Sequence, residues 1–335
     1  MARLRRVSPG SRGWTRRRAG RGFVYLDEDG IRLDVELAGR CKALVIPPAW
    51  QDVWICPVAN GHIQAVGTDE AGRRQYLYHP VWREQRDKAK HDRILTVAAR
   101  LPQARRTVAT QLALDGMPKE RALATAFRLL DLGLFRIGGE TYAEAHGSFG
   151  LATITKAHTR INGTDVEFEY VAKSGLDRCV AVRDPHVRDA VDALRRRRGG
   201  GTELLAYRHD GHWRDVSSDD INTYVKDVIG GDVSAKDFRT WHGTVLAAVA
   251  LGVRVDAAMS ATKRKRAVRE TIVSVAEQLG NTPTVARSSY VDPRVIDRFE
   301  DGVTIAPTLQ RIGPRVGADR RRDKIERAVL RMLRQ

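Results

Sequence analysis

The pattern of hydrophobic and polar positions divides the chain into a strand-like first part and a helical remainder. Between Phe23 and His79, short apolar runs alternate with turn sequences, and Asn60-Gly61 is a strong signal for a tight turn. This pattern predicts strands at residues 23–26 and 31–33 and a hairpin formed by residues 62–68 and 73–79. We therefore expect a small antiparallel β domain at residues 22–88.

Helical periodicity dominates after residue 80. It predicts helices at residues 80–100, 120–132, 185–198, 218–229, 237–251, 264–279 and 319–333. A β insert interrupts them, with strands at residues 149–154, 165–172 and 176–182 and a turn at Ser174-Gly175. The predicted fold class is α+β: the small antiparallel domain, a mainly helical domain at residues 89–312 with a β-hairpin insert, and a basic helix at residues 313–335.

The charge of the chain points to a polyanionic partner. Residues 1–21 are rich in Arg, Gly and Ser and predict a flexible basic arm. The chain holds 58 Lys and Arg against 41 Asp and Glu, a net charge of +17. Such a surface gains affinity for nucleic acid by releasing condensed counterions. No apolar run approaches the ~20 residues of a membrane-spanning helix, so we expect no membrane association. Charge alone leaves a basic ribosome-associated protein open.

Cysteine and histidine usage indicates neither disulfides nor a metal site. Cys41, Cys56 and Cys179 are scattered and odd in number, and the histidines lack ligand spacing. The chain also lacks a phosphate-cradling GxxxxGK[ST] loop, and no apolar signal core follows its basic N-terminus. We therefore expect a cytoplasmic protein with no metal, nucleotide or other cofactor.

Four segments carry residue types suited to chemistry at a phosphodiester. A phenol with an ordinary pKa near ~10 needs neighbouring positive charge to act as a nucleophile. The planar fork of arginine matches phosphate oxygens, and a lysine among other cations can donate a proton. The segments are Phe135-Arg136-Ile137-Gly138, Tyr170-Val171-Ala172-Lys173-Ser174-Gly175, Lys236-Asp237-Phe238-Arg239-Thr240, and Leu279-Gly280-Asn281-Thr282-Pro283 continuing to Ser289-Tyr290.

In this order, the four segments resemble the poxvirus-like bacterial branch of the type IB DNA topoisomerases. The resemblance extends to residues 72–78, Gly-Arg-Arg-Gln-Tyr-Leu-Tyr, and so covers about residues 22–300. It implies a catalytic domain of the tyrosine recombinase/topoisomerase IB type at residues 89–312. It further implies that residues 22–88 help a monomer to clamp around double-stranded DNA. The implied activity is relaxation of supercoiled DNA in the nucleoid, without metal or ATP.

The resemblance also implies a role for each matched residue. Tyr290 would attack the phosphorus, form a 3′-phosphotyrosyl bond and expel a 5′-hydroxyl, while Arg136 and Arg239 bind the non-bridging oxygens. Lys173, at the tip of the predicted hairpin, would act with Arg136 as general acid on the 5′ oxygen. Asn281 would donate a hydrogen bond to a non-bridging oxygen, at a position where the poxvirus enzymes have His.

Five further residues are candidates for DNA contact: Gln75, Tyr76, Tyr78, Tyr142 and Lys236. Gln75 suits an adenine edge in the major groove, and a tyrosine hydroxyl suits a phosphate. Lys236 lies one helical turn before Arg239, where it can pair with a backbone phosphate. For the three residues on the predicted strand, packing within the sheet is an equal alternative.

Two other functions stay open. Tyrosine recombinases use the same Arg, Lys, Arg and Tyr chemistry, but they usually have His where this chain has Lys236, and a helical amino domain. A non-catalytic DNA-binding protein with a decayed site is the second alternative, and the intact Arg136, Lys173, Arg239 and Tyr290 count against it.

Overall fold

A computed structural model describes residues 3–139, 147–254, 259–313 and 315–335. The chain divides into two compact units, Met1–Asp92 and Arg93–Gln335, and the division falls within helix α2 (Pro80–Leu112). The predicted boundary, after residue 88, lies close to it. The C-terminal helix belongs to the second unit. Tyr142, a predicted DNA contact, lies outside the described residues.

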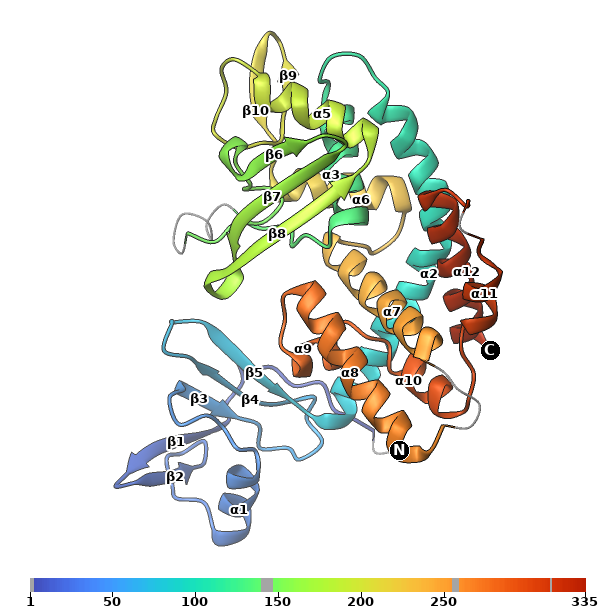
Figure 1. The fold of residues 1–335 in the computed structure, drawn as a ribbon. Helices are drawn as coiled ribbons and strands as arrows, with labels where there is room; N and C mark the ends of the chain where they lie inside the picture. The colour runs from blue at the N-terminus through green and yellow to red at the C-terminus, as the bar shows by residue number, and fades with distance from the viewer. Residues whose placement is uncertain (1–2, 140–146, 255–258, 314) are drawn as a thin grey trace. The chain divides into compact units, whose positions relative to one another are not determined.

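The first unit is built on a five-stranded antiparallel sheet with the order β2-β1-β3-β4-β5 (Figure 1). Its strands are β1 (Trp14–Ala19), β2 (Gly22–Leu26), β3 (Gln51–Ile55), β4 (Ile63–Thr68) and β5 (Arg74–Tyr78). Helix α1 (Val35–Ala43) follows Asp34, whose side chain accepts from the Leu37 amide. The main hydrophobic core of the first unit includes Trp14, Tyr25, Val53, Ile55 and Ala65.

Part of the predicted basic arm is a strand, so the prediction of a flexible arm over residues 1–21 is wrong for residues 14–19. β1 pairs with both β2 and β3, and the Trp14 side chain is buried in the core. Arg16 donates to the carbonyls of Ile46 (3.0 Å) and Trp50 (2.9 Å), and its guanidinium lies over the Phe23 ring. Arginine stems can cover a sheet while their charged ends find acceptors, which a compositional argument overlooks.

The second unit is mainly helical, and the predicted α+β fold class is confirmed (Figure 1). Besides most of α2, its helices are α3 (Lys119–Gly133), α5 (Pro185–Arg196), α6 (Ser218–Ile229), α7 (Ala235–Arg254), α8 (Ala261–Leu279), α9 (Pro283–Ser289), α10 (Pro293–Glu300), α11 (Ala306–Arg311) and α12 (Ala318–Arg334). The predicted insert is a three-stranded sheet of β6 (Thr159–Asn162), β7 (Asp165–Ala172) and β8 (Leu176–Arg183). A second hairpin joins β9 (Ala206–His209) to β10 (His212–Asp215).

Two predicted strands do not form. Residues 149–154 make a turn in which the Thr153 and Ile154 amides both donate to the Gly150 carbonyl. Residues 31–33 contribute only a single bridge, from Arg32 to Leu26. Both segments are apolar enough to read as strands, but their alternation is too short to fix an extended backbone. Among the described residues, every helix is too short or too polar to span a bilayer.

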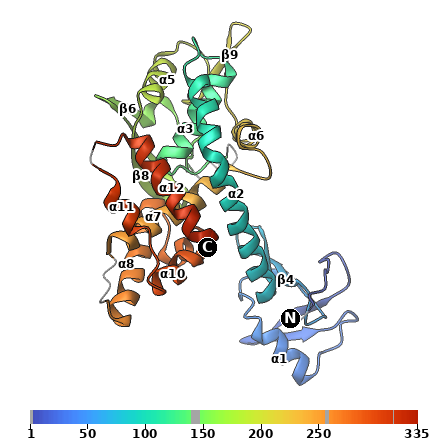
Figure 2. The same cartoon turned by 90° about the vertical axis from the view of Figure 1, so that its right-hand side faces the viewer.

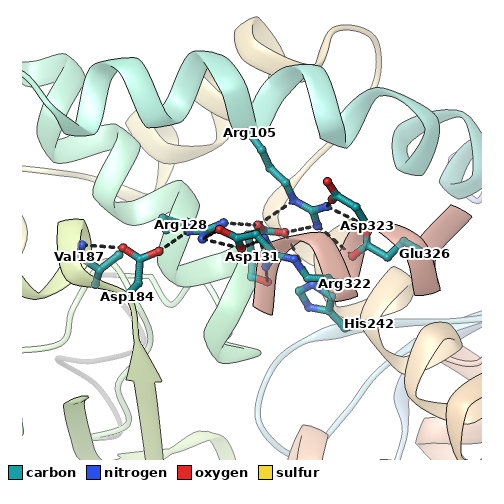
Figure 3. A network of polar contacts seen from close by, with 10 residues as sticks. Arg105, Arg128, Asp131, Asp184, Val187, His242, Arg322, Asp323 and Glu326 are labelled. Carbon is teal, nitrogen blue, oxygen red and sulfur yellow. Dashed lines mark hydrogen bonds and ion pairs between the residues drawn. The ribbon is translucent and has the colours of Figure 1, made fainter. Parts of the chain in front are cut away.

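A buried set of charges fixes the C-terminal helix to the second unit (Figure 3). Asp131, near the end of α3, is 2% exposed, and its carboxylate contacts Arg105 of α2 (2.8 Å) and Arg322 of α12 (3.1 Å). Arg105 also contacts Glu326 of α12 at 2.7 Å. Figure 2 shows α12 beside α2 and α7. Because an unpaired buried charge is costly, these pairs hold α12 in place.

His242 of α7 lies against this set of charges and should make stability depend on pH. Burial, with the nearby Arg105, Arg322 and Arg239, lowers the pKa of His242 to about 4, although Asp131 opposes the shift from 3.9 Å away. An unfolded histidine titrates near ~6.5, so between these values only the unfolded chain binds the proton. Stability is therefore full above about pH 6.5 and falls by up to about 1.4 kcal/mol per unit as the pH drops toward 4.

Urea unfolding from pH 7.5 to pH 4.5 measures this effect. His242→Gln should flatten the loss of stability, and the difference between the two proteins removes the contribution of His158, whose pKa burial also lowers. If the free energy of unfolding fell equally with pH in the two proteins, His242 would not be neutral and buried as described.

Candidate active site

The carbonyl oxygens at the end of α8 gather three arginine side chains. The last carbonyls of a helix have no intrahelical donor and carry partial negative charge. They therefore attract cations and hold them in a fixed pattern. The pairs are Arg178 Nη2 with Gln278 O (2.8 Å), Arg239 Nη2 with Leu279 O (2.7 Å) and Arg136 Nη2 with Gly280 O (2.8 Å). Two of these three arginines were predicted to bind phosphate.

Arg239 is held from two sides in the interior. It is 3% exposed, and its Nη1 donates to the carbonyl of Leu134 at 2.5 Å. Leu134 ends α3 in the left-handed conformation, with φ 56°. The start of α7 is fixed by Asp237, whose carboxylate accepts two hydrogen bonds of 2.9 Å from Arg93. Asp237 in the Lys-Asp-Phe-Arg segment thus positions the helix that carries Arg239.

Tyr290 follows α9 and faces the arginines. The Cζ atom of Arg239 lies 5.1 Å from the centre of the Tyr290 ring. Burial opposes ionisation of Tyr290, but the charges of Arg239, Arg136 and Lys236 outweigh it, so the pKa of this phenol is lowered from its ordinary value. A lowered pKa favours the phenolate, which is the reactive form of an oxygen nucleophile.

Helix α7 also contacts the backbone of Tyr290. The residues that make this contact, Gly243 and Thr244, were missed by the sequence analysis. A Cβ atom on Gly243 would lie 2.8 Å from the Tyr290 carbonyl oxygen, so only glycine permits this approach. Thr244 Oγ1 shares its one proton between the Thr240 carbonyl at 2.9 Å and the Tyr290 carbonyl at 3.3 Å, and it accepts from the Asp292 amide at 3.1 Å. The helix that carries Arg239 therefore also fixes Tyr290, about one turn further along. The sequence feature that could have indicated this contact is the Gly243-Thr244 pair, which follows Arg239 by about one helical turn.

Asn281 lies directly beside Arg136. Gly280 ends α8 with φ 60°, which turns the chain. The backbone N–H of Asn281 then donates to the Ala276 carbonyl at 2.9 Å. Asn281 Oδ1 then accepts from Arg136 Nη2 at 2.7 Å. The side chain was predicted to donate to a phosphate oxygen. Within the protein, Oδ1 accepts from Arg136 and Nδ2 donates to the Leu279 carbonyl at 3.4 Å. Donation to a phosphate oxygen stays a prediction.

Replacing Asn281 with histidine should retain or raise the rate of DNA cleavage. A neutral imidazole can accept from Arg136 as the amide does, and a protonated one adds a charged donor for a phosphate oxygen. Single-turnover cleavage of a labelled duplex measures the rate, and Asn281→Ala, which removes both functions, serves as the reference. Loss of cleavage in Asn281→His would show that the position demands an amide.

Lys173 lies at the tip of the β7–β8 hairpin, as predicted. The turn η2 (Lys173–Gly175) places Ser174 and Gly175 both in the left-handed region, with φ 69°. The Lys173 side chain is exposed. It lines one cavity together with Tyr170, Arg178, Arg136, Arg239 and Gly280. The structure thus brings this lysine and both predicted phosphate-binding arginines to a single cavity.

The candidate DNA contacts differ in how they are placed. Lys236 is exposed on α7, three residues before the buried Arg239. On β5 of the first unit, the Tyr76 and Tyr78 side chains are exposed and their rings stack with centroids 6.0 Å apart. Strand alternation puts Gln75 on the opposite face of the sheet, where its amide donates to Asp69 at 2.8 Å. Gln75 and the two tyrosines therefore do not present one common surface.

This arrangement suits nucleophilic substitution at a phosphodiester. It combines a phenol of lowered pKa beside Arg239 with two guanidinium groups held by a helix end. An exposed lysine lines one cavity with both guanidinium groups. Within the described ranges, no group of three or more His, Cys, Asp or Glu side chains has the geometry of a metal site.

Comparison with known proteins identifies the family. Residues 79–306 match the family model described as "Eukaryotic DNA topoisomerase I, catalytic core", and residues 22–69 match "Bacterial DNA topoisomerase IB, N-terminal domain". The chain is also 26% identical over 300 residues to "DNA topoisomerase 1B" of Acanthamoeba polyphaga mimivirus, an alignment that covers 86% of this chain and 88% of the relative. The first match spans more than half of the sequence. The chain therefore belongs to the type IB DNA topoisomerases.

Proposed function

We propose that this topoisomerase relaxes supercoiled DNA through a transient covalent bond between Tyr290 and the 3′ phosphate of one strand. The observation that supports this most directly is the position of Tyr290, whose ring lies 5.1 Å from the Arg239 guanidinium while its pKa is lowered. Arg136, held at the same end of α8, supplies the second guanidinium. Both guanidiniums can stabilise the charge that builds on the phosphate oxygens in the transition state.

In the proposed step, the Tyr290 oxygen forms a bond to phosphorus as the bond from phosphorus to the 5′ oxygen breaks. The phenol gives up its proton to solvent, and Lys173 with Arg136 supplies one to the departing 5′ oxygen. Religation runs the same step in reverse. Because the phosphotyrosyl bond conserves the energy of the broken phosphodiester, no nucleotide or metal ion is needed. DNA torsion drives rotation of the cut strand while it is free.

We also propose how the protein holds its substrate. Lys236, exposed beside the arginine site, pairs with a backbone phosphate, and the exposed Tyr76 and Tyr78 contact DNA from the first unit. Residues 22–88 serve as a clamp around duplex DNA, and the enzyme acts as a monomer in the cytoplasm, on nucleoid DNA. Sheet packing as the role of Tyr76 and Tyr78 is disfavoured by their exposed fractions of 44% and 40%.

A supercoiled plasmid without recombination sites, in EDTA and without ATP, tests the proposal. We expect a ladder of partly relaxed topoisomers that proceeds to full relaxation. A tyrosine recombinase would instead exchange strands between two specific sites, and a non-catalytic DNA-binding protein would leave the topology unchanged after its removal. Either result, or a requirement for a divalent ion, would overturn the proposed mechanism.

A further inference from the structure

We propose that Arg178 is a positioning residue that holds the hairpin bearing Lys173 against the end of α8, so that the lysine meets the 5′ oxygen beside the phosphate-binding arginines. This inference rests on the proposed function of Lys173 as general acid.

Arg178 connects the hairpin to the helix through two hydrogen bonds. It lies on β8, five residues after Lys173, directly opposite the buried Tyr170 in the β7–β8 register. Its Nη1 donates to the Glu277 carbonyl at 3.2 Å and its Nη2 to the Gln278 carbonyl at 2.8 Å. The planar guanidinium, with separate donors at a fixed spacing, suits two successive carbonyls.

Gly280 makes room for this contact. A Cβ atom at position 280 would lie 3.2 Å from Arg178 Nη1 and 3.4 Å from its Cζ, and the residue has φ 60°. The same turn contributes the carbonyl that holds Arg136, and the preceding Leu279 carbonyl holds Arg239. One helix end therefore sets the positions of both phosphate-binding arginines and of the hairpin that carries the general acid.

Arg178 differs from the two phosphate-binding arginines in the element that carries it. It lies on the same hairpin as Lys173, whereas Arg136 follows α3 and Arg239 lies on α7. Its bonds to the Glu277 and Gln278 carbonyls therefore connect the hairpin to the end of α8. For this reason we assign Arg178 an effect on the leaving group rather than on the charge of the transition state.

The chemistry of the leaving group provides the test. A DNA substrate in which sulfur replaces the 5′ oxygen at the cleavage site expels a thiolate, whose conjugate acid has a pKa near ~8.5. This leaving group needs no proton in the transition state, whereas an alkoxide does. A defect in general acid catalysis is therefore suppressed on the sulfur substrate, and a defect in phosphate binding persists. Single-turnover cleavage of both substrates would be measured with wild-type protein, Arg178→Ala, Arg178→Lys, Lys173→Ala and Arg239→Ala.

We expect Arg178→Ala to slow cleavage of the oxygen substrate by about 10–100-fold, as displacements of about 1 Å in active sites do, and to cleave the sulfur substrate within about threefold of wild type. Arg178→Lys should show a smaller defect with the same suppression. Arg183→Ala is the matched control, since Arg183 is an exposed arginine on the same strand that pairs with Asp165 at 2.6 Å; it should cleave both substrates normally.

The inference is overturned if Arg178→Ala and Arg178→Lys cleave the oxygen substrate normally, or if their defect persists on sulfur as that of Arg239→Ala does. Failure of the proposed function looks different: wild-type protein would form no adduct on either substrate, or Lys173→Ala would not be rescued by sulfur. Thermal unfolding of each variant distinguishes a local displacement from loss of the fold, and a general unfolding of both Arg178 variants would also count against a positioning role.

Discussion

Replacing Tyr290 with phenylalanine should abolish the covalent protein–DNA adduct while leaving noncovalent DNA binding intact. The ring that packs against Arg239 is retained. Gly243 and Thr244 contact the backbone of residue 290 and do not touch the tyrosine hydroxyl. The proposed attacking oxygen is the one atom removed, so the bond to phosphorus should not form. Denaturing gels of a labelled duplex measure the adduct, and a mobility shift measures binding.

Tyr170→Phe is the matched control for this experiment. Tyr170 is a second phenol, which lines the cavity with Lys173 and both phosphate-binding arginines, but burial outweighs the opposing charges of Arg178, Arg239 and Arg136 and raises its pKa. This variant should still form the adduct. An adduct that persists in Tyr290→Phe and disappears in Tyr170→Phe would show that the wrong phenol has been assigned as nucleophile.

Replacing Arg239 with lysine should lower the rate of cleavage at saturating DNA by about 10²–10³-fold, the usual cost of losing one preorganised donor in a transition state. The guanidinium bonds Leu134 and Leu279 through separate Nη atoms while facing the Tyr290 ring. An ammonium group keeps the charge but cannot reproduce this planar arrangement. Single-turnover cleavage measures the loss.

The same exchange further along α7 provides the control. Arg254 bonds Thr271 at 2.9 Å, outside the site, and Arg254→Lys should cleave at the wild-type rate. If Arg239→Lys cleaves as fast as Arg254→Lys, the fixed guanidinium does not stabilise the transition state. If Arg239→Lys unfolds while Arg254→Lys stays folded, Arg239 serves the core rather than the reaction.

Much of the fold could be predicted from local signals. Helical periodicity predicted residues 218–229, and α6 has these bounds; in the structure Ser217 and Asp220 form a capping box at its start and Gly230 follows its end. Residues 165–172 and 176–182 read as a hairpin because their alternation is interrupted only by Ser174-Gly175. The errors arose where charged residues interrupted the hydrophobic pattern of a strand, or where an apolar segment was too short to define its secondary structure. The arginines of β1 masked a strand that lies between two others, and the apolar residues 149–154 form a turn.

The site itself was only partly predictable. Resemblance to a family supplied Arg136, Lys173, Arg239 and Tyr290, but the feature that assembles the arginines is a row of backbone carbonyls at the end of α8. Carbonyls leave no mark in a sequence pattern, because every residue has one. Arg178 was therefore indistinguishable from the other basic residues of a chain that has 58 of them. Asn281 was expected to face phosphate, and only the folded chain shows it accepting from Arg136.

The most direct test of the covalent mechanism is to trap the protein on a duplex with a nick near the cleavage site, digest the complex, and map the modified peptide by mass spectrometry. We predict a single adduct on Tyr290, joined to the 3′ phosphate of the cut strand. An adduct on another residue, attachment to a 5′ phosphate, or relaxation of plasmid DNA without any covalent intermediate would contradict it.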